Sequence, residues 1–345
     1  MMDSSKDTAV DNLKITTCEM HTYGTPIKIV ENGVPDIPGR TILDKMNNLE
    51  NKFSHIIKFM SYEPRGHHAV SVLRVKPDNP KADVAILFYE KEGCLTMCGE
   101  ATLAFGRYCI DNGLVKPTEP ETSIAIQCPC GLVPISVKYK NGISGNATLR
   151  SVPSFVFGTD IEINLDEIGV INVDVAFGGG FYAIVSAEDI GVNFGDIKSL
   201  RLASRIGHML NEAIVKKVKL SHPDNDGLAL FIGTLIVDTS DLSTDRVVKQ
   251  MPVFRDSEGR GPCGSGTSAH IVTLLAKEKL TLGESVVFNS AMSGVGFTAK
   301  VIEETKCGEH RAFTVEISGK GHYIGKQVMT LEQDDALKRG FIGIS

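Results

Sequence analysis

Two cysteines of this chain occupy the same position in two copies of a short motif. Cys98 begins the run Cys-Gly-Glu-Ala-Thr-Leu-Ala, and Cys263 begins Cys-Gly-Ser-Gly-Thr-Ser-Ala. A stretch with helical character follows each copy, so each thiol is expected just ahead of a helix. Unpaired backbone N–H groups and the positive end of the helix dipole favour a thiolate there. Two such thiols would suit removal of a proton from one face of a carbon and delivery to the other.

The composition narrows the class of protein around these thiols. With 345 residues, of which 42% are hydrophobic and 23% charged, the chain is large enough for two globular domains. A net charge of −6, without basic patches interleaved with aromatic residues, argues against nucleic acid as a partner. No apolar run approaches the length of a membrane span, and residues 1–13 are too polar for a secretory signal. We therefore expect a cytoplasmic protein that uses neither membrane nor nucleic acid.

The remaining cysteines give no metal signature. Eight cysteines in a cytoplasmic chain of this size are expected to be reduced. Cys94 and Cys98 are four residues apart, and Cys128-Pro129-Cys130 forms a C-P-C run. Neither makes the paired knuckles of a zinc site, and no histidine pair follows at ligand spacing. The sequence thus predicts no metal.

The pattern of apolar runs and glycines predicts an α+β fold. Helices are expected after Cys98, over 197–218, and from Cys263 to about 278. Strands are expected at 84–89, 124–127, 132–137, 171–177, 228–233, 235–237, 286–288, 296–301 and 312–317. Because most strands follow one another without a helix between them, α+β is favoured over a doubly wound sheet. We predict a disordered lead-in over 1–13, one domain over 14–190 and a second over 191–345, whose final strands are free to cross back.

The two cysteine motifs and their surroundings resemble the proline racemase superfamily. The resemblance rests on 97–99 and 260–267, with supporting stretches at 20–30, 63–67, 128–133, 177–182, 222–224 and 319–323. It implies the diaminopimelate-epimerase type of fold, with two similar domains that each wrap a curved, mostly antiparallel sheet around a central helix. It also implies a small amino-acid substrate, no cofactor, and Cys98 and Cys263 as thiolate base and thiol acid across one cleft. It allows a homodimer.

Residue 263 separates the reactions known in this superfamily. The intervening sequence looks most like the animal trans-3-hydroxy-L-proline dehydratases, a branch that typically has Thr at this position. Cys263 instead favours a racemase or epimerase of proline, hydroxyproline or a related amino acid, which needs a second thiol at the α-carbon. The dehydratase (a lyase) is the alternative, and an inactive or binding-only homologue is the third hypothesis.

Four positions depart from the pattern of the superfamily. Glu100 stands where a His is usual, and Gly259 stands where an Asp is usual. Tyr23 and Thr25 replace a usual Gly and Glu. The usual His and Asp help to hold the ring nitrogen of the substrate. Their replacement leaves three possibilities open: a changed substrate, a retained proline-type substrate, or lost activity.

The resemblance also indicates where a substrate would bind. Backbone N–H groups at Gly99–Glu100 and Gly264–Ser265 are expected to hold its carboxylate and the charge that develops beside it. Glu100 and Glu258 are candidates for pairing with its ammonium, and Phe254 is a candidate for lining the ring pocket. Without that pairing, the carboxylate of Glu100 would disfavour a thiolate at Cys98.

Overall fold

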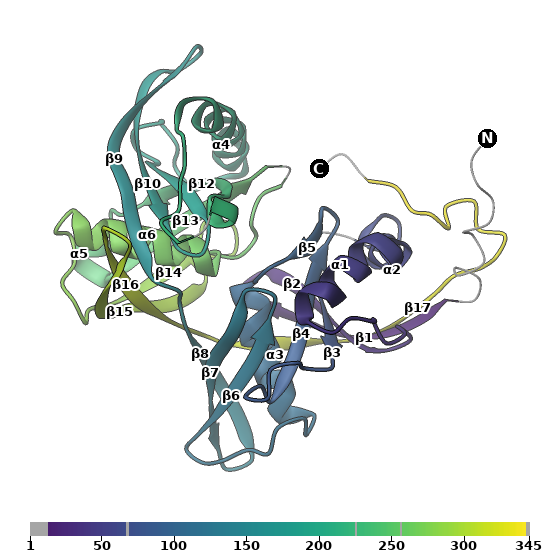
Figure 1. The fold of residues 1–345 in the computed structure, drawn as a ribbon. Helices are drawn as coiled ribbons and strands as arrows, with labels where there is room; N and C mark the ends of the chain where they lie inside the picture. The colour runs from purple at the N-terminus through teal and green to yellow at the C-terminus, as the bar shows by residue number, and fades with distance from the viewer. Residues whose placement is uncertain (1–12, 67–68, 225, 256, 343–345) are drawn as a thin grey trace. The chain divides into compact units, whose positions relative to one another are not determined.

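The computed structural model describes residues 13–66, 69–224, 226–255 and 257–342, and these fall into two compact units (Figure 1). Unit 1 holds the described residues up to Ala147 together with those from Lys320 onward, and unit 2 holds Thr148–Gly319. The division thus lies inside strand β8 (Ile143–Arg150), not near residue 190 as the sequence predicts. Of the predicted lead-in, residues 1–12 lie outside the described part, and the Leu13 carbonyl accepts a hydrogen bond from the Leu331 N–H.

Unit 1 is a mixed sheet folded around one helix. Its strands are β1 (Lys14–Thr22), β2 (Thr25–Asn32), β3 (Val70–Val75), β4 (Val84–Glu90), β5 (Gly93–Leu95), β6 (Glu121–Cys128), β7 (Gly131–Lys140) and β17 (Gly321–Thr330). Pairing runs in the order β17–β1–β2–β3–β4–β6–β7, antiparallel except for β2–β3 and β4–β6. Helix α3 (Gly99–Asp111) contacts β1, β2, β3, β7 and β17, and eleven of its thirteen residues are buried. A helix buried on every side belongs at the centre of its unit.

Glycines allow α3 to approach the strands closely. A Cβ at Gly106 would lie 2.2 Å from Ile135 Cδ1 of β7. A Cβ at Gly321 of β17 would lie 2.6 Å from the Cα of Ala104. Side chains at these two positions would push α3 away from the sheet, and with it the residue that precedes the helix.

Two further helices of unit 1 have no counterpart among the predicted elements. These are α1 (Ile42–Lys52) and α2 (Ser54–Ser61). A capping box begins α1, because the Thr41 hydroxyl accepts from the Asp44 N–H and the Asp44 carboxylate accepts from the Thr41 N–H. Both helices bury their apolar side chains in the core that includes Leu87 and Tyr89 of β4.

Unit 2 is a closed ring of strands around a second buried helix. Its strands are β9 (Ser154–Leu165), β10 (Gly169–Phe177), β11 (Phe181–Ser186), β12 (Phe231–Asp238), β13 (Val247–Phe254), β14 (Ser285–Ser290), β15 (Gly296–Cys307) and β16 (His310–Gly319). Each pairs with the next, and the ring closes where β16 pairs with β9, at Ala312 with Phe155 and Phe313 with Ser154. Helix α6 (Gly264–Ala276) contacts β9, β10, β11, β15 and β16, and ten of its thirteen residues are buried (Figure 1). Because β9, β10 and β11 belong to this ring, the division falls earlier in the chain than predicted.

Helix α4 (Ile197–Lys217) covers β12 and β13 of unit 2 from outside the ring. Its start is capped by Asp196, whose carboxylate accepts from the N–H groups of Lys198 and Ser199. Strand β12 begins at Phe231, so the strand predicted over 228–233 is wrong in its first half, where Asp226–Leu228 form a 3₁₀ turn instead. The strand predicted over 235–237 is the second half of β12, and β15 runs six residues beyond the predicted 296–301. The other predicted strands and helices are confirmed to within three residues.

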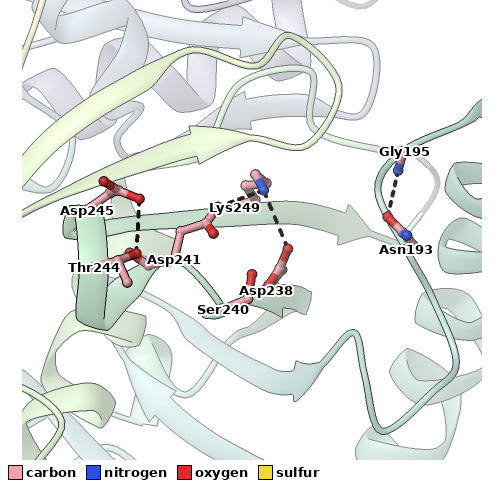
Figure 2. A network of polar contacts seen from close by, with 8 residues as sticks. All are labelled: Asn193, Gly195, Asp238, Ser240, Asp241, Thr244, Asp245 and Lys249. Atoms are coloured by element: carbon pink, nitrogen blue, oxygen red, sulfur yellow. Dashed lines mark hydrogen bonds and ion pairs between the residues drawn. The ribbon is translucent and has the colours of Figure 1, made fainter.

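At the surface of unit 2, a polar network joins the connection between β12 and β13 to the start of β13 (Figure 2). Lys249 lies 2.9 Å from Asp241 and 3.7 Å from Asp238, and the hydrogen bond to Asp241 raises the pKa of Lys249. Short helix α5 (Leu242–Asp245) follows Asp241. Because the charged groups are partly exposed, each ion pair is worth no more than about 1 kcal/mol, and the network orders a connection rather than a site.

Both units therefore have the α+β architecture that the sequence predicts, a mostly antiparallel sheet around a central helix. Among the described residues, no helix combines the length and the apolar character needed to cross a membrane.

Candidate active site

Cys98 is the residue immediately before α3. Its backbone is extended, with φ of −139°, and its carbonyl accepts hydrogen bonds from the N–H of Thr102 (2.9 Å) and from the Thr102 hydroxyl (2.7 Å). Cys98 therefore directly precedes the first turn of α3, whose N–H groups have no partner within the helix. Its side chain is partly exposed.

Cys263 is the equivalent residue before α6, with a different backbone. Its φ of +65° lies in the left-handed region, which residues with a side chain rarely adopt. The Cys263 carbonyl accepts the Thr267 N–H at 2.8 Å, and the residue is buried. A strained conformation of this kind persists only where the surroundings hold it.

Gln250 of β13 holds the turn before Cys263. Its side-chain amide is fully buried and donates to the Pro262 carbonyl and to the Thr267 hydroxyl, the latter at 2.7 Å. Its carbonyl oxygen lies 3.1 Å from Nδ1 of His270, so that nitrogen carries the ring proton. Burial lowers the pKa of His270 to about 3, which keeps this histidine neutral.

Two hydroxyl groups lie beside the Cys263 thiol. The phenol oxygen of Tyr182, a fully buried residue of β11, is 3.3 Å from Cys263 Sγ and 2.7 Å from Ser265 Oγ. Ser265 Oγ is itself 3.6 Å from the same sulfur. Hydroxyl groups that donate to sulfur favour the thiolate over the thiol.

The glycine run ahead of Tyr182 brings β11 close to α6. A Cβ at Gly178 would lie 2.1 Å from the Ser265 carbonyl oxygen and 2.6 Å from the Ala269 nitrogen. The chain therefore crosses close to the first turn of α6 at this point. Tyr182 and Gln250 were not among the predicted site residues. The sequence signals for Tyr182 were its place two residues after this run and its inclusion in the stretch 177–182 that supports the family resemblance.

Glu100 lies in the first turn of α3 and is 7% exposed. Its carboxylate lies 3.4 Å from the Thr25 hydroxyl, and its backbone carbonyl accepts the Thr22 hydroxyl at 3.0 Å. Positions 25 and 100, two of the departures from the superfamily pattern, are therefore in contact. Where the pattern has a Glu at 25 and a His at 100, this chain has the carboxylate at 100 and a hydroxyl at 25. The pair of positions 25 and 100 therefore still contains one carboxylate, at position 100.

Glu258 and Phe254 lie at the end of β13, in unit 2. The Glu258 carboxylate accepts from the Ser204 hydroxyl and lies 3.3 Å from Nε2 of His208, both on α4. Burial alone would raise the pKa of Glu258, but these two contacts lower it, so the carboxylate is ionised. Phe254 packs against the apolar cluster that contains Cys263 and Tyr182.

Position 259 has no room for the aspartate that is usual there. A Cβ on Gly259 would lie 2.9 Å from Pro252 Cγ and 3.2 Å from Phe254 Cε2. The Gly259 N–H donates to the Pro252 carbonyl at 2.8 Å, which closes this turn onto β13. The turn ahead of Cys263 therefore requires a glycine at position 259.

The C-P-C run lies near the first cysteine motif. The Cys130 N–H donates to the carbonyl of Thr96, two residues before Cys98, at 3.1 Å. A hydrogen bond between the two thiols, reinforced by burial and by Cys98, raises the pKa of Cys128, and the same bond lowers that of Cys130. All eight cysteines lie in the described part of the chain, and none forms a disulfide there.

The prediction that both motif cysteines directly precede helices is confirmed. That Cys98 and Cys263 act on one substrate, with the groups assigned to substrate binding, stays a prediction.

A sheet around a buried helix in each unit, with a thiol at each helix start, defines the class of two-domain epimerase folds. The chain belongs to the proline racemase family, whose model matches residues 17–342. It is 42% identical to a trans-L-3-hydroxyproline dehydratase of Saccoglossus kowalevskii, over 94% of this chain and 99% of that one. It is 31% identical to the proline racemase of Acetoanaerobium sticklandii, over 95% and 98%. A crystal structure of a hydroxyproline epimerase from Agrobacterium vitis with bound trans-4-hydroxy-L-proline matches with a TM-score of 0.84 and 27% identity, covering 96% of both chains.

Proposed function

We propose that this protein is a cofactor-independent racemase or epimerase that inverts the α-carbon of proline, hydroxyproline or a related amino acid in the cytoplasm. The observation that carries the proposal is the matched position of two cysteines, Cys98 before α3 and Cys263 before α6. The known activities of family members, a racemase and an epimerase among them, support this class of reaction.

In the proposed reaction, one thiolate takes the α-hydrogen as a proton and becomes a thiol. The electron pair left on the α-carbon is delocalised into the substrate carboxylate. The other thiol then delivers its proton to the opposite face of the carbon and becomes a thiolate. Nothing is lost from the substrate, and the next turnover runs from the opposite protonation state.

The site must lower a high activation barrier, because an amino-acid α-proton is a weak acid and a thiolate is a mild base. We assign its carboxylate to the N–H groups of Gly99–Glu100 and Gly264–Ser265, where developing negative charge is stabilised by about 3–4 kcal/mol per donor in comparable sites. We assign its ammonium to Glu100, whose carboxylate belongs to the first turn of α3, and keep Glu258, held by Ser204 and His208 of α4, as the alternative partner.

The test is incubation of the full chain with a panel of L- and D-amino acids in deuterated water. Loss of the α-proton signal in the NMR spectrum, with the enantiomer or epimer appearing, is expected for proline or a hydroxyproline. Exchange that needs added metal, pyridoxal phosphate or nucleotide would contradict a cofactor-independent reaction.

A second function is favoured by the overall sequence, since the 42% identical relative is named a trans-L-3-hydroxyproline dehydratase. In that reaction Cys98 takes the α-proton, and the hydroxyl on the neighbouring carbon leaves as water, which gives an enamine that rearranges to a cyclic imine. The variant Cys263→Thr separates the two functions. A dehydratase retains turnover of trans-3-hydroxy-L-proline in this variant, whereas a racemase loses its second proton-transfer group.

A further inference from the structure

A mixed cluster of ligand-type side chains lies in unit 2 and shares no residue with the candidate active site. It consists of His222 and Asp224, from the connection between α4 and β12, and Cys307, the last residue of β15. One ligand atom from each residue lies within 4.8 Å of the others. Imidazole, carboxylate and thiol together form a ligand set that zinc accepts and that magnesium or calcium does not favour.

The distances within the cluster match a tetrahedral zinc site. Cys307 Sγ is 3.7 Å from His222 Nε2 and 3.6 Å from Asp224 Oδ2. Zinc bonds of about 2.3 Å to sulfur and about 2.0 Å to nitrogen or oxygen place those atoms roughly 3.5 Å apart at tetrahedral angles. Small movements of the side chains, together with a rotation of the Asp224 backbone N–H away from His222, would therefore bring all three ligand atoms to one ion.

The fold holds these residues together from two directions. Gly308, with φ of +55°, follows Cys307 in the β15–β16 turn, and a Cβ on it would lie 2.4 Å from Pro223 Cβ. The turn therefore packs directly against the segment between His222 and Asp224. The His222 ring also packs on Phe177, with ring centroids 4.6 Å apart. His222 and Cys307 are buried and Asp224 is exposed, so the cluster has rigid walls and an opening to solvent.

We propose that His222, Asp224 and Cys307 bind one zinc ion, with a fourth position open to water. On binding, Cys307 releases its thiol proton to solvent and forms the Zn–S bond. His222 binds through Nε2 while its ring proton moves to Nδ1, so the Asp224 N–H, now 3.3 Å from Nδ1, must turn away. The ion would fasten the connection before β12 to the β15–β16 turn, and turnover at Cys98 and Cys263 does not require it.

The experiment is titration of the metal-free full chain with Co²⁺, followed by displacement with Zn²⁺. We expect a thiolate-to-cobalt charge-transfer band that saturates at one equivalent and disappears on adding Zn²⁺. Cys307→Ser should abolish the band. Cys130→Ser, which removes an exposed thiol of unit 1, is the matched control and should leave it unchanged.

A second variant covers the case in which Cys307→Ser fails to fold. Asp224→Asn changes an exposed residue and should weaken Co²⁺ binding more than tenfold while circular dichroism stays that of the wild type. The rise in melting temperature that Zn²⁺ gives the wild type should be lost in the same variant. Absence of the band in the wild type, its survival in Cys307→Ser, or unchanged affinity in Asp224→Asn would overturn the proposal.

Discussion

The two helix starts that carry the cysteine motifs have the same position in their units but different surroundings. Before α3, Cys98 has an extended backbone, and the first turn holds a buried carboxylate, Glu100. Before α6, Cys263 has a left-handed backbone, and two hydroxyl groups, of Tyr182 and Ser265, lie beside its sulfur. Both helix starts carry a cysteine, but the first turn of α3 contains a carboxylate, whereas two neutral hydroxyl groups lie beside the sulfur of Cys263.

This difference shows that a duplicated motif fixes position and not chemistry. A hydroxyl group that donates to sulfur stabilises a thiolate, whereas a nearby carboxylate opposes one. The variants below test whether these different surroundings give Cys98 and Cys263 different roles.

The largest expected effect comes from removing either thiol. Cys98→Ser and Cys263→Ser should each lower racemisation by on the order of a thousandfold or more, because each removes one of two obligatory proton-transfer groups. Turnover of each enantiomer, followed by chiral chromatography, measures this. Cys130→Ser, at a thiol outside both motifs, is the control. Full racemisation by either motif variant would show that the two thiols are not both required for proton transfer.

The next effect concerns the stability of the protein in acid. Of the two central helices only α6 can contribute to it through a histidine, because α3 contains none. Burial lowers the pKa of His270 from its ordinary 6.5 to about 3. Between these two pH values the imidazole is protonated in the unfolded chain but neutral in the folded one. This contribution to the free energy of unfolding is fully present above pH 6.5. It falls by a few kcal/mol, on the order of 4, as the pH drops towards 3.

Denaturant unfolding between pH 7 and pH 3 measures the slope. His270→Gln should flatten it, because the variant has no imidazole at this buried position to titrate. An equal slope in the His270 variant would mean that other groups cause the acid sensitivity.

A smaller effect is expected from the hydroxyl groups beside Cys263. In a Cys98→Ser/Cys130→Ser background, Tyr182→Phe should raise the pH at which half of Cys263 is alkylated by iodoacetamide. With Cys98 and Cys130 present, the same change should slow racemisation about tenfold, the worth of one hydrogen bond to a charged group. Tyr108→Phe, whose phenol contacts Glu31 in unit 1, is the matched control. An unchanged alkylation profile would show that the Tyr182 hydroxyl does not stabilise the Cys263 thiolate.

The smallest effect is expected at Glu100. Glu100→Gln keeps the size of the side chain and its contact with Thr25 but removes the charge. Cys98 should then be alkylated at a lower pH, while KM rises severalfold because the substrate ammonium loses its partner. Glu258→Gln should leave the alkylation of Cys98 unchanged. A Glu100 variant that alters neither quantity would place the carboxylate outside the site.

Sequence reasoning located both thiols because the motif is local, a cysteine, a turn-forming glycine and a helix in consecutive residues. It missed Tyr182, which lies 81 residues from Cys263 along the chain, because strand pairing and not spacing brings the two together. It missed the cluster at Cys307 for the same reason, since His222 is 85 residues away. Ligand spacing identifies metal sites only where the ligands are neighbours in sequence.

The boundary between the two units also could not be predicted from local sequence patterns. Closure of the ring in unit 2 depends on pairing between Phe155 and Ala312, which no window of sequence reveals. Helix α1 was missed for a different reason. Its signal was present, in the Thr41-x-x-Asp44 capping box, but its apolar residues are too few to stand out as periodic.

The central claim is that two thiols invert one α-carbon, and the products of three substrates test it most directly. The wild-type chain is given L-proline, trans-4-hydroxy-L-proline and trans-3-hydroxy-L-proline separately in deuterated water, and the products are resolved by chiral chromatography and NMR. Our account predicts inversion of at least one of them, with deuterium at the α-carbon of the product. Release of a cyclic imine from trans-3-hydroxy-L-proline, without inversion of the other two, would contradict it and establish the dehydratase instead.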